Sequence, residues 1–203
     1  ELLPVSAKTG FNLSNVRQKI WENIRVHPGS KATWDFCLGL FGRTNVGKSS
    51  LLNAIAGKSV SKVHSQAHTT RDFIDHIVRF SHKTARLIDF AGFIKGNPKR
   101  ELEKKIKEKI RMALTLIDVC ALVIDSSEGV SNLDRRLFQM VLKAGKPCIV
   151  VANKSDKGVI PIKNLERLFP NTFIVSTSAL TGKNIWDVLN VAVETLLLKK
   201  KTL

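Results

Sequence analysis

One eight-residue segment, Gly42-Arg43-Thr44-Asn45-Val46-Gly47-Lys48-Ser49, limits the folds available to this chain more than any other feature. It matches the pattern Gly-x-x-x-x-Gly-Lys-Ser and lies between an apolar run, 35–41, and a helical pattern that begins at Lys48. Glycines let a backbone curl so that its N–H groups surround phosphate oxygens, and the following helix directs its positive end at the same charge. The alternative, a glycine-rich turn with an exposed lysine, is disfavoured by this context.

The segment therefore predicts a phosphate-binding loop, which does not by itself distinguish ATP from GTP. We expect Lys48 to bridge the β- and γ-phosphates and Ser49 to bind Mg²⁺. The predicted nucleotide contacts are Gly42, Arg43, Thr44, Asn45, Val46, Gly47, Lys48, Ser49 and Ser50.

Two later segments indicate a guanine base. Asn153-Lys154-Ser155-Asp156 follows the apolar run 147–152, at the carboxyl end of an expected strand, where folds of this kind bind ligands. Guanine presents two adjacent N–H donors, which the carboxylate of Asp156 can accept, whereas adenine has neither. Asn153 can tie this loop to the phosphate loop, and the Lys154 stem can cover the base. Backbone N–H groups of Ser178, Ala179 and Leu180 can meet the guanine O6 atom.

Two further segments have the character of switches that respond to the γ-phosphate. Asp89-Phe90-Ala91-Gly92 ends an expected strand, so Asp89 can hold a Mg²⁺-bound water and the Gly92 N–H can meet the γ-phosphate. Thr69-Thr70 offers a hydroxyl to Mg²⁺, and we assign it to Thr70 with Thr69 as the alternative. Without the other motifs, Thr69-Thr70 would be an ordinary polar loop.

Strand and helix patterns alternate from residue 35 onward, which predicts an α/β fold. We expect the P-loop NTPase architecture, a mostly parallel six-stranded sheet with helices on both faces. The pair 73–80 and 84–89, joined by a turn at 81–83, is antiparallel in character and places one strand at the edge. The expected strands are 35–41, 73–80, 84–89, 119–125, 147–153 and 172–177, and the expected helices are 48–56, 100–117, 132–144, 162–168 and one from about 184.

One internal repeat bears on domain organisation. Residues 5–13 (VSAKTGFNL) match residues 177–185 (TSALTGKNI), and each copy runs into a helix with apolar spacing. We therefore expect residues 1–25 to be the C-terminal tail of a truncated upstream domain of the same kind. Residues 26–34, with Pro28-Gly29-Ser30, are the expected linker, and residues 35–203 are the expected complete domain.

Charge is the unusual part of the composition. Thirty-three Lys and Arg against 17 Asp and Glu give a net charge of +16, which favours a polyanionic partner such as RNA over a role in solubility alone. No apolar stretch approaches the length of a membrane span. Cys37, Cys120 and Cys148 each lie in a strand-like run and are expected to be small buried hydrophobes. Reduced thiols fit a cytoplasmic location, bacterial or in an organelle stroma or matrix.

The five motifs, in this order over residues 35–198, resemble the small GTPases of the bacterial Era, MnmE and Der (EngA) group. The segments 41–56, 69–72 and 87–93 are similar to that group as a whole. The repeated domain tail before a second phosphate loop is most similar to the Der family of tandem GTPases. The family usually has Thr at the position of Phe90 and Gly at that of His68.

This resemblance implies a GTP-hydrolysing switch in assembly of the large ribosomal subunit, with GTP or GDP and Mg²⁺ as ligands and the subunit or its rRNA as partner. It also implies an upstream GTPase domain and a C-terminal KH-like domain in the full-length protein. Two alternatives remain. One is a nucleotide-gated rRNA-binding module with little hydrolysis, and the other is an Era- or MnmE-like GTPase of RNA processing or tRNA modification.

Ras-like GTPases have a glutamine directly after Asp-x-x-Gly that orients the attacking water. Here Phe93 occupies that position and cannot do so, so catalysis must come from another group. In potassium-activated members of the resembled group, an Asn at the position of Asn45 helps to hold K⁺ against the phosphates. The alternative is that Asn45 only caps the loop by hydrogen bonding. The expected catalytic set is thus Lys48, Asn45, Thr70 and Gly92, with Ser49, Thr70 and Asp89 at the metal.

A basic segment, 95–111, offers a second functional surface. It holds eight Lys or Arg and three Glu, and helical spacing places Lys104, Lys107 and Arg111 on one face. This pattern predicts contact with RNA near a nucleotide-sensitive loop. The alternative is a solvated helix face with Glu–Lys pairs.

Overall fold

The computed structural model describes residue 4 and residues 34–58, 74–90 and 100–201. The chain divides into two units, Glu1–Thr33 and Trp34–Leu203, and all described helices and strands lie in the second. Apart from residue 4, the expected tail, 1–25, lies outside the described residues, and so does the expected linker, 26–34, apart from residue 34. Thr69, Thr70 and Gly92 also lie outside them.

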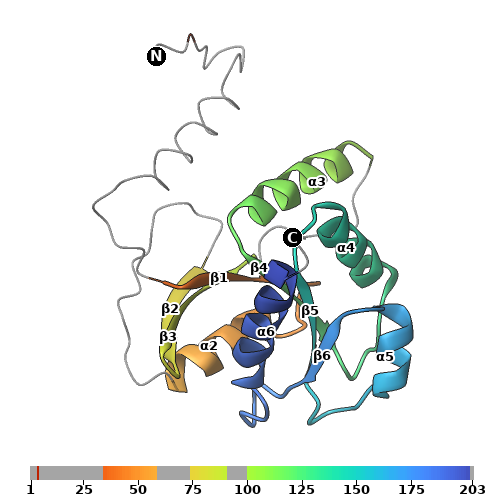
Figure 1. Ribbon diagram of the computed structural model, residues 1–203. Helices are drawn as coiled ribbons and strands as arrows, with labels where there is room; N and C mark the ends of the chain where they lie inside the picture. The colour runs from red at the N-terminus through yellow and green to blue at the C-terminus, as the bar shows by residue number, and fades with distance from the viewer. Residues whose placement is uncertain (1–3, 5–33, 59–73, 91–99, 202–203) are drawn as a thin grey trace. The chain divides into compact units, whose positions relative to one another are not determined.

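A six-stranded sheet forms the centre of the second unit, with strand order β2-β3-β1-β4-β5-β6 (Figure 1). All neighbouring pairs are parallel except β2 with β3, so the expected mostly parallel sheet with an antiparallel edge strand is confirmed. The strands are β1 Phe36–Phe41, β2 Ile74–Phe80, β3 Lys83–Asp89, β4 Val119–Asp125, β5 Cys148–Asn153 and β6 Phe173–Ser176.

Helices pack on both faces of the sheet, as the alternating pattern predicts. They are α2 Lys48–Lys58, α3 Arg100–Thr115, α4 Asn132–Lys143, α5 Ile162–Leu168 and α6 Asp187–Lys201. Apolar side chains of α2 and α6 form one core with the sheet, and those of α3, α4 and α5 form the other. Every residue of the central strands β1, β4 and β5 is buried, which explains why these strands are continuous apolar runs.

Element ends differ from the expectation by a few residues. The last helix begins at Asp187 rather than at about 184, because Asn184 adopts φ 53° and its side-chain amide donates to the Ser176 carbonyl at 3.0 Å. The hairpin turn shortens to Ser81-His82, since Lys83 already pairs with Phe80 across the two strands. Ser81 takes the positive φ of 49° that a two-residue turn requires.

Phe90, which replaces the threonine usual in the resembled family, is buried in the core on the α3 face. Its ring stacks on that of Phe41 with centroids 4.6 Å apart. Gly39 in β1 makes the space, because a Cβ there would lie 2.9 Å from the Phe90 ring and 2.8 Å from Ile117. The larger side chain at 90 is thus accommodated by the core and leaves Asp89 in place at the strand end.

Cys37, Cys120 and Cys148 are free and buried, which confirms their interpretation as small core residues. Burial, with the neighbouring Cys148 thiol, raises the pKa of Cys120 well above its usual value. None of the described helices has the length and apolar character needed to cross a membrane.

The crowding at Gly39 predicts opposite effects for the same substitution at two glycines. Gly39→Ala should destabilise the fold by about 1–3 kcal/mol, because the new methyl overlaps Ile117 and Phe90. Gly57→Ala in α2 should be neutral or stabilising by up to about 1 kcal/mol, because no atom lies within 4 Å of its Cβ position and alanine favours a helix. Urea unfolding of both variants measures the difference. Equal stabilities would contradict the packing described here.

Candidate functional site

The predicted nucleotide motifs converge at the carboxyl edge of the sheet, where β1, β3, β4 and β5 end. The phosphate loop joins β1 to α2, and its backbone has φ 143° at Gly42, 65° at Asn45 and 91° at Gly47. A Cβ at Gly42 would lie 2.2 Å from the Val123 carbonyl oxygen, and one at Gly47 would lie 2.4 Å from the Asn153 amide. Both glycines are therefore required by conformation and by close contact.

Lys48 is buried beneath its own loop. Its ammonium donates to the carbonyl oxygens of Gly42 at 2.9 Å and Arg43 at 2.5 Å. Burial lowers the pKa of Lys48 from its usual value, and the carboxylates of Asp89 and Asp134 partly offset that effect. The loop thus surrounds a cation at the point where the sequence predicts phosphate.

Ser49 and Asp89, the predicted metal residues, are brought together from α2 and β3. The Ser49 hydroxyl donates to Asp89 Oδ2 at 2.5 Å. Asp89 Oδ1 is buried and has no hydrogen-bond partner in the described part of the chain. A hydroxyl and an unsatisfied carboxylate oxygen are ligands, direct or through water, that suit Mg²⁺. Among the described residues there is no cluster of three or more His, Cys, Asp or Glu that could hold a metal ion.

The side chain of Arg43 points to α4 and the loop before it. Arg43 forms ion pairs with Glu128 at 3.1 Å and with Asp134 at 3.1 Å, and donates to the Gly129 carbonyl at 3.2 Å. Asp134 is fully buried and also forms a capping box with Ser131 at the start of α4. Because these bonds occupy the guanidinium, only the backbone of Arg43 remains available to contact a nucleotide.

Asn153 connects the guanine segment to the phosphate loop, as expected. Its buried side-chain amide donates to the Val46 carbonyl at 3.0 Å. Its Oδ1 accepts from the Thr177 hydroxyl at 3.3 Å and from the Ala179 N–H at 3.1 Å. One asparagine therefore joins three loops, those after β1, β5 and β6.

Lys154, at φ 62°, lies against the end of β4. Its ammonium bonds the buried carboxylate of Asp125 at 2.6 Å. Burial alone would raise the pKa of Asp125, but hydrogen bonds from Lys154 and Ser127 outweigh it and lower this pKa to about 2. The position of the Lys154 stem is thus fixed by an ion pair.

Asp156 lies at the surface and accepts the Ser178 hydroxyl at 2.5 Å. That hydrogen bond is the main cause that lowers the pKa of Asp156, so the carboxylate is charged at neutral pH. The Ser178 N–H donates to the Lys183 carbonyl, and the Ala179 N–H donates to Asn153 Oδ1. To bind a guanine O6, either N–H must share this hydrogen bond with the base or give it up. Leu180 is 82% exposed.

Asn45 is exposed, and within the described residues no hydrogen bond holds its side chain. The structure therefore gives no support to the alternative that Asn45 caps the loop. Thr70 and Gly92, the switch residues, lie outside the described residues.

Sequence reasoning missed the acidic partners of the basic residues: Asp125, Glu128 and Asp134. Asp125 was identifiable as a carboxylate at a strand end. Ser131-x-x-Asp134 before an apolar run was identifiable as a capping box. No local pattern indicates that Asp134 also pairs with Arg43, 91 residues earlier in the chain.

Comparisons with known proteins agree with this geometry. Residues 37–154 match the family described as 50S ribosome-binding GTPase. The chain is 34% identical over 198 residues to a GTPase Der of Aquifex aeolicus, covering 94% of this chain and 46% of that protein. It is 36% identical over 165 residues to a GTPase Der of Corynebacterium efficiens, covering 75% of this chain and 30% of that protein. The chain thus spans half or less of the length of these relatives.

Solved structures show the same fold. An Aquifex aeolicus Era bound to GDP and AlF₄⁻ has a TM-score of 0.63 and 29% identity, over 79% of this chain and 56% of that chain. Era in complex with MgGDPNP and a segment of 16S ribosomal RNA has a TM-score of 0.61 and 29% identity, with the same coverage.

The Lys154–Asp125 ion pair predicts a specific loss of stability in acid. The pKa of Asp125 is about 2 in the folded chain, against about 4 when unfolded, so the unfolded chain binds the proton more readily. The stabilisation is therefore complete above about pH 4 and is lost as the pH falls toward 2. Thermal unfolding across this range should show a shallower acid dependence for Asp125→Asn.

Glu166→Gln on α5 is the matched control, because no ion pair holds Glu166 in the described part of the chain. Its acid dependence should follow the wild type. An unchanged acid dependence in Asp125→Asn would contradict the role of the ion pair.

Proposed function

Because the chain belongs to the 50S ribosome-binding GTPase family, we propose that it is a guanine-nucleotide switch in assembly of the large ribosomal subunit. GTP hydrolysis follows from the family, and the ribosomal role is the proposed part. The single observation that carries the nucleotide assignment is the junction at Asn153, which holds the phosphate loop against the guanine segment. The similarity to GTPases named Der, over up to 94% of this chain, supports the ribosomal role.

The residues at the sheet edge have distinct tasks in this proposal. Loop N–H groups and the Lys48 ammonium bind the phosphates, and the charge of Lys48 offsets the charge that develops on the β–γ bridging oxygen. Ser49 and Asp89 are suited to hold Mg²⁺, which when bound supplies further positive charge at the phosphates. Thr70 and Gly92 are proposed to complete this shell from the two switches.

Base recognition is assigned to Asp156, whose charged carboxylate can accept both guanine donors. Ser178 orients that carboxylate through its 2.5 Å hydrogen bond. Lys154, held by Asp125, is proposed to cover the base, and the backbone at Ala179 and Leu180 is proposed to meet O6.

We further propose that K⁺ activates hydrolysis through Asn45. The side chain of Asn45 is exposed and makes no hydrogen bond in the described region, so it is available to a cation at the phosphates. Phe93 cannot orient a water as a glutamine does, which leaves charge stabilisation to another group.

A Der-like role is preferred over an Era- or MnmE-like one. The Der relatives reach 34% identity over 94% of this chain, against 29% over 79% for the Era structures. We propose the domain organisation on the same basis: residues 1–25 as the tail of an upstream GTPase domain, 26–34 as linker and 35–203 as a GTPase domain. A KH-like domain, rRNA as partner and a cytoplasmic or organellar location belong to this proposal as well.

Asp156→Asn tests the guanine assignment. The amide cannot accept both donors of the base, so GDP binding should weaken by about 2–4 kcal/mol, as for a lost charged hydrogen bond. Titration calorimetry with GDP measures the loss. Lys157→Gln, the neighbouring surface change, should leave the affinity within about twofold. Unchanged GDP affinity in Asp156→Asn would refute the assignment.

Turnover in KCl against NaCl at matched ionic strength tests the cation proposal. We expect faster hydrolysis in KCl, because a weakly hydrated K⁺ is proposed to act where an arginine finger contributes roughly 10³–10⁵-fold. Asn45→Gly is the suitable variant, since glycine accepts the φ of 65° at this position and removes only the amide.

Equal wild-type rates in both salts would remove the cation from the mechanism. A potassium effect that persists in Asn45→Gly would keep the cation and exclude Asn45.

A further inference from the structure

A basic pocket of about 510 Å³ lies between α3 and α4, away from the nucleotide site. α3 ends just before β4 begins, and α4 ends just before β5 begins, so the pocket lies beside the amino ends of these strands. The nucleotide motifs occupy the opposite, carboxyl ends. A ligand in the pocket and a nucleotide at the sheet edge can therefore be bound together.

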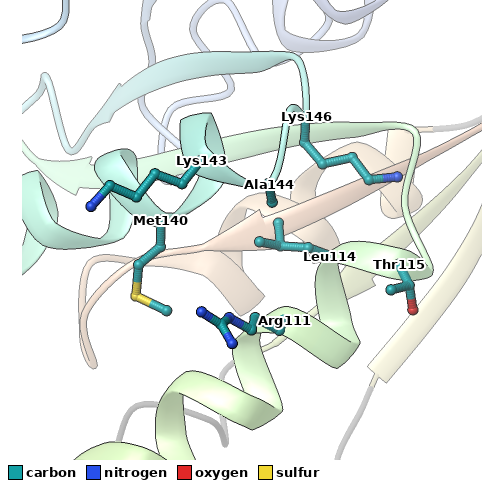
Figure 2. Close-up of a pocket in the computed structure, with 7 residues that line it drawn as sticks. All are labelled: Arg111, Leu114, Thr115, Met140, Lys143, Ala144 and Lys146. Atoms are coloured by element: carbon teal, nitrogen blue, oxygen red, sulfur yellow. The ribbon is translucent and has the colours of Figure 1, made fainter.

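Three cations surround this pocket, and its described lining contains no carboxylate. Figure 2 shows Arg111 and Met140 facing each other across the space, while the ammonium groups of Lys143 and Lys146 extend to opposite sides. Lys146 also donates to the Ile117 carbonyl at 2.7 Å, which fixes its stem. Between the cations, the half-buried side chain of Met140 supplies an apolar part of the lining, whereas Leu114 is only 2% exposed.

Among the described side chains, no partner neutralises the charge of Arg111 or Lys143. Both side chains are exposed, and neither forms an ion pair or hydrogen bond within the part of the chain that the structure describes. Lys199 of α6 adds a further cation nearby, because its ammonium donates to the Gly145 carbonyl, next to Lys146. The basic region is thus built by three helices that are distant in sequence.

The spacing of these cations distinguishes a polyanion from a small anion. A single small anion at an exposed site gains little from cations that point in different directions, because water and salt screen each interaction. A nucleic-acid strand meets several cations at once and releases its condensed counterions, which gives a large and salt-dependent affinity. The half-buried side chain of Met140 can pack against a ribose or a base.

We propose that the α3–α4 pocket, defined by Arg111, Lys143 and Lys146, binds the backbone of single-stranded RNA, with Met140 against a ribose or base. This inference rests on the proposed function, since it names the surface that binds the RNA partner. It extends the predicted basic face of α3 to a second helix. Of the three residues predicted on that face, Lys104, Lys107 and Arg111, the structure describes the side chain of Arg111.

The test measures binding of a fluorescein-labelled 20-nucleotide RNA of mixed sequence by anisotropy, from 50 to 300 mM KCl. The variant is Arg111→Gln with Lys143→Gln. The matched control is Lys163→Gln with Arg167→Gln on α5, which removes one exposed Lys and one exposed Arg outside the pocket. Both variants have the same net charge, so long-range attraction is equal in the two.

We expect the pocket variant to bind about fivefold more weakly, near 0.1 M salt, for each phosphate that it no longer neutralises. Its slope of log affinity against log salt should fall by about 0.7 for each such phosphate. The control should stay near the wild type in both respects. The exchange Arg111→Lys with Lys143→Arg keeps the charges and should keep most of the affinity.

Three outcomes would overturn the proposal. Equal RNA affinity in the pocket variant and the control would exclude the pocket while leaving the RNA partner in place. Displacement by polyglutamate as readily as by unlabelled RNA, at equal charge, would indicate an acidic protein partner instead. Absence of RNA binding by the wild type would refute both the pocket and the RNA part of the proposed function. GDP affinity is the folding control. We expect it to be unchanged in every variant, which would show that the fold is intact.

Discussion

The organisation of the nucleotide edge depends on the side chain of Asn153. It donates to the phosphate loop at Val46 and accepts from Thr177 and Ala179, all within a buried environment. Burial of an amide costs free energy unless its donors and acceptors are paired. These hydrogen bonds therefore fix the positions of the three loops relative to one another. Gly47 is part of the same junction, because a Cβ there would collide with the Asn153 amide.

Two ion pairs support this junction from either side. Asp125 at the end of β4 holds Lys154, and Asp134 at the start of α4 holds Arg43. Each carboxylate is buried, so removal of its partner would leave a charge without compensation. The basic residues beside the nucleotide motifs are thus positioned by the neighbouring strand and helix, and the loops have little freedom to form alternatives.

Basic residues with partners inside the fold and exposed basic residues lie at opposite ends of the sheet. Near the nucleotide edge, Lys48, Arg43 and Lys154 all have partners inside the fold, and only Lys48 is buried. At the opposite end of the sheet, Arg111 and Lys143 lie exposed around a pocket. The first arrangement suits a specific, oriented ligand, and the second suits a diffuse polyanion.

The sequence by itself determined the fold class, the order of the motifs along the chain and most element ranges, because the phosphate-loop, amphipathic-helix and buried-strand patterns are local. It also indicated the contact of Asn153 with the phosphate loop, since both follow strands of one sheet. Only the tertiary structure decided that Arg43 turns to Asp134, that Gly39 makes room for Phe90, and that α3 and α4 share a basic pocket. These arrangements join residues far apart in the chain, and they depend on side-chain volume and direction, which no local pattern encodes.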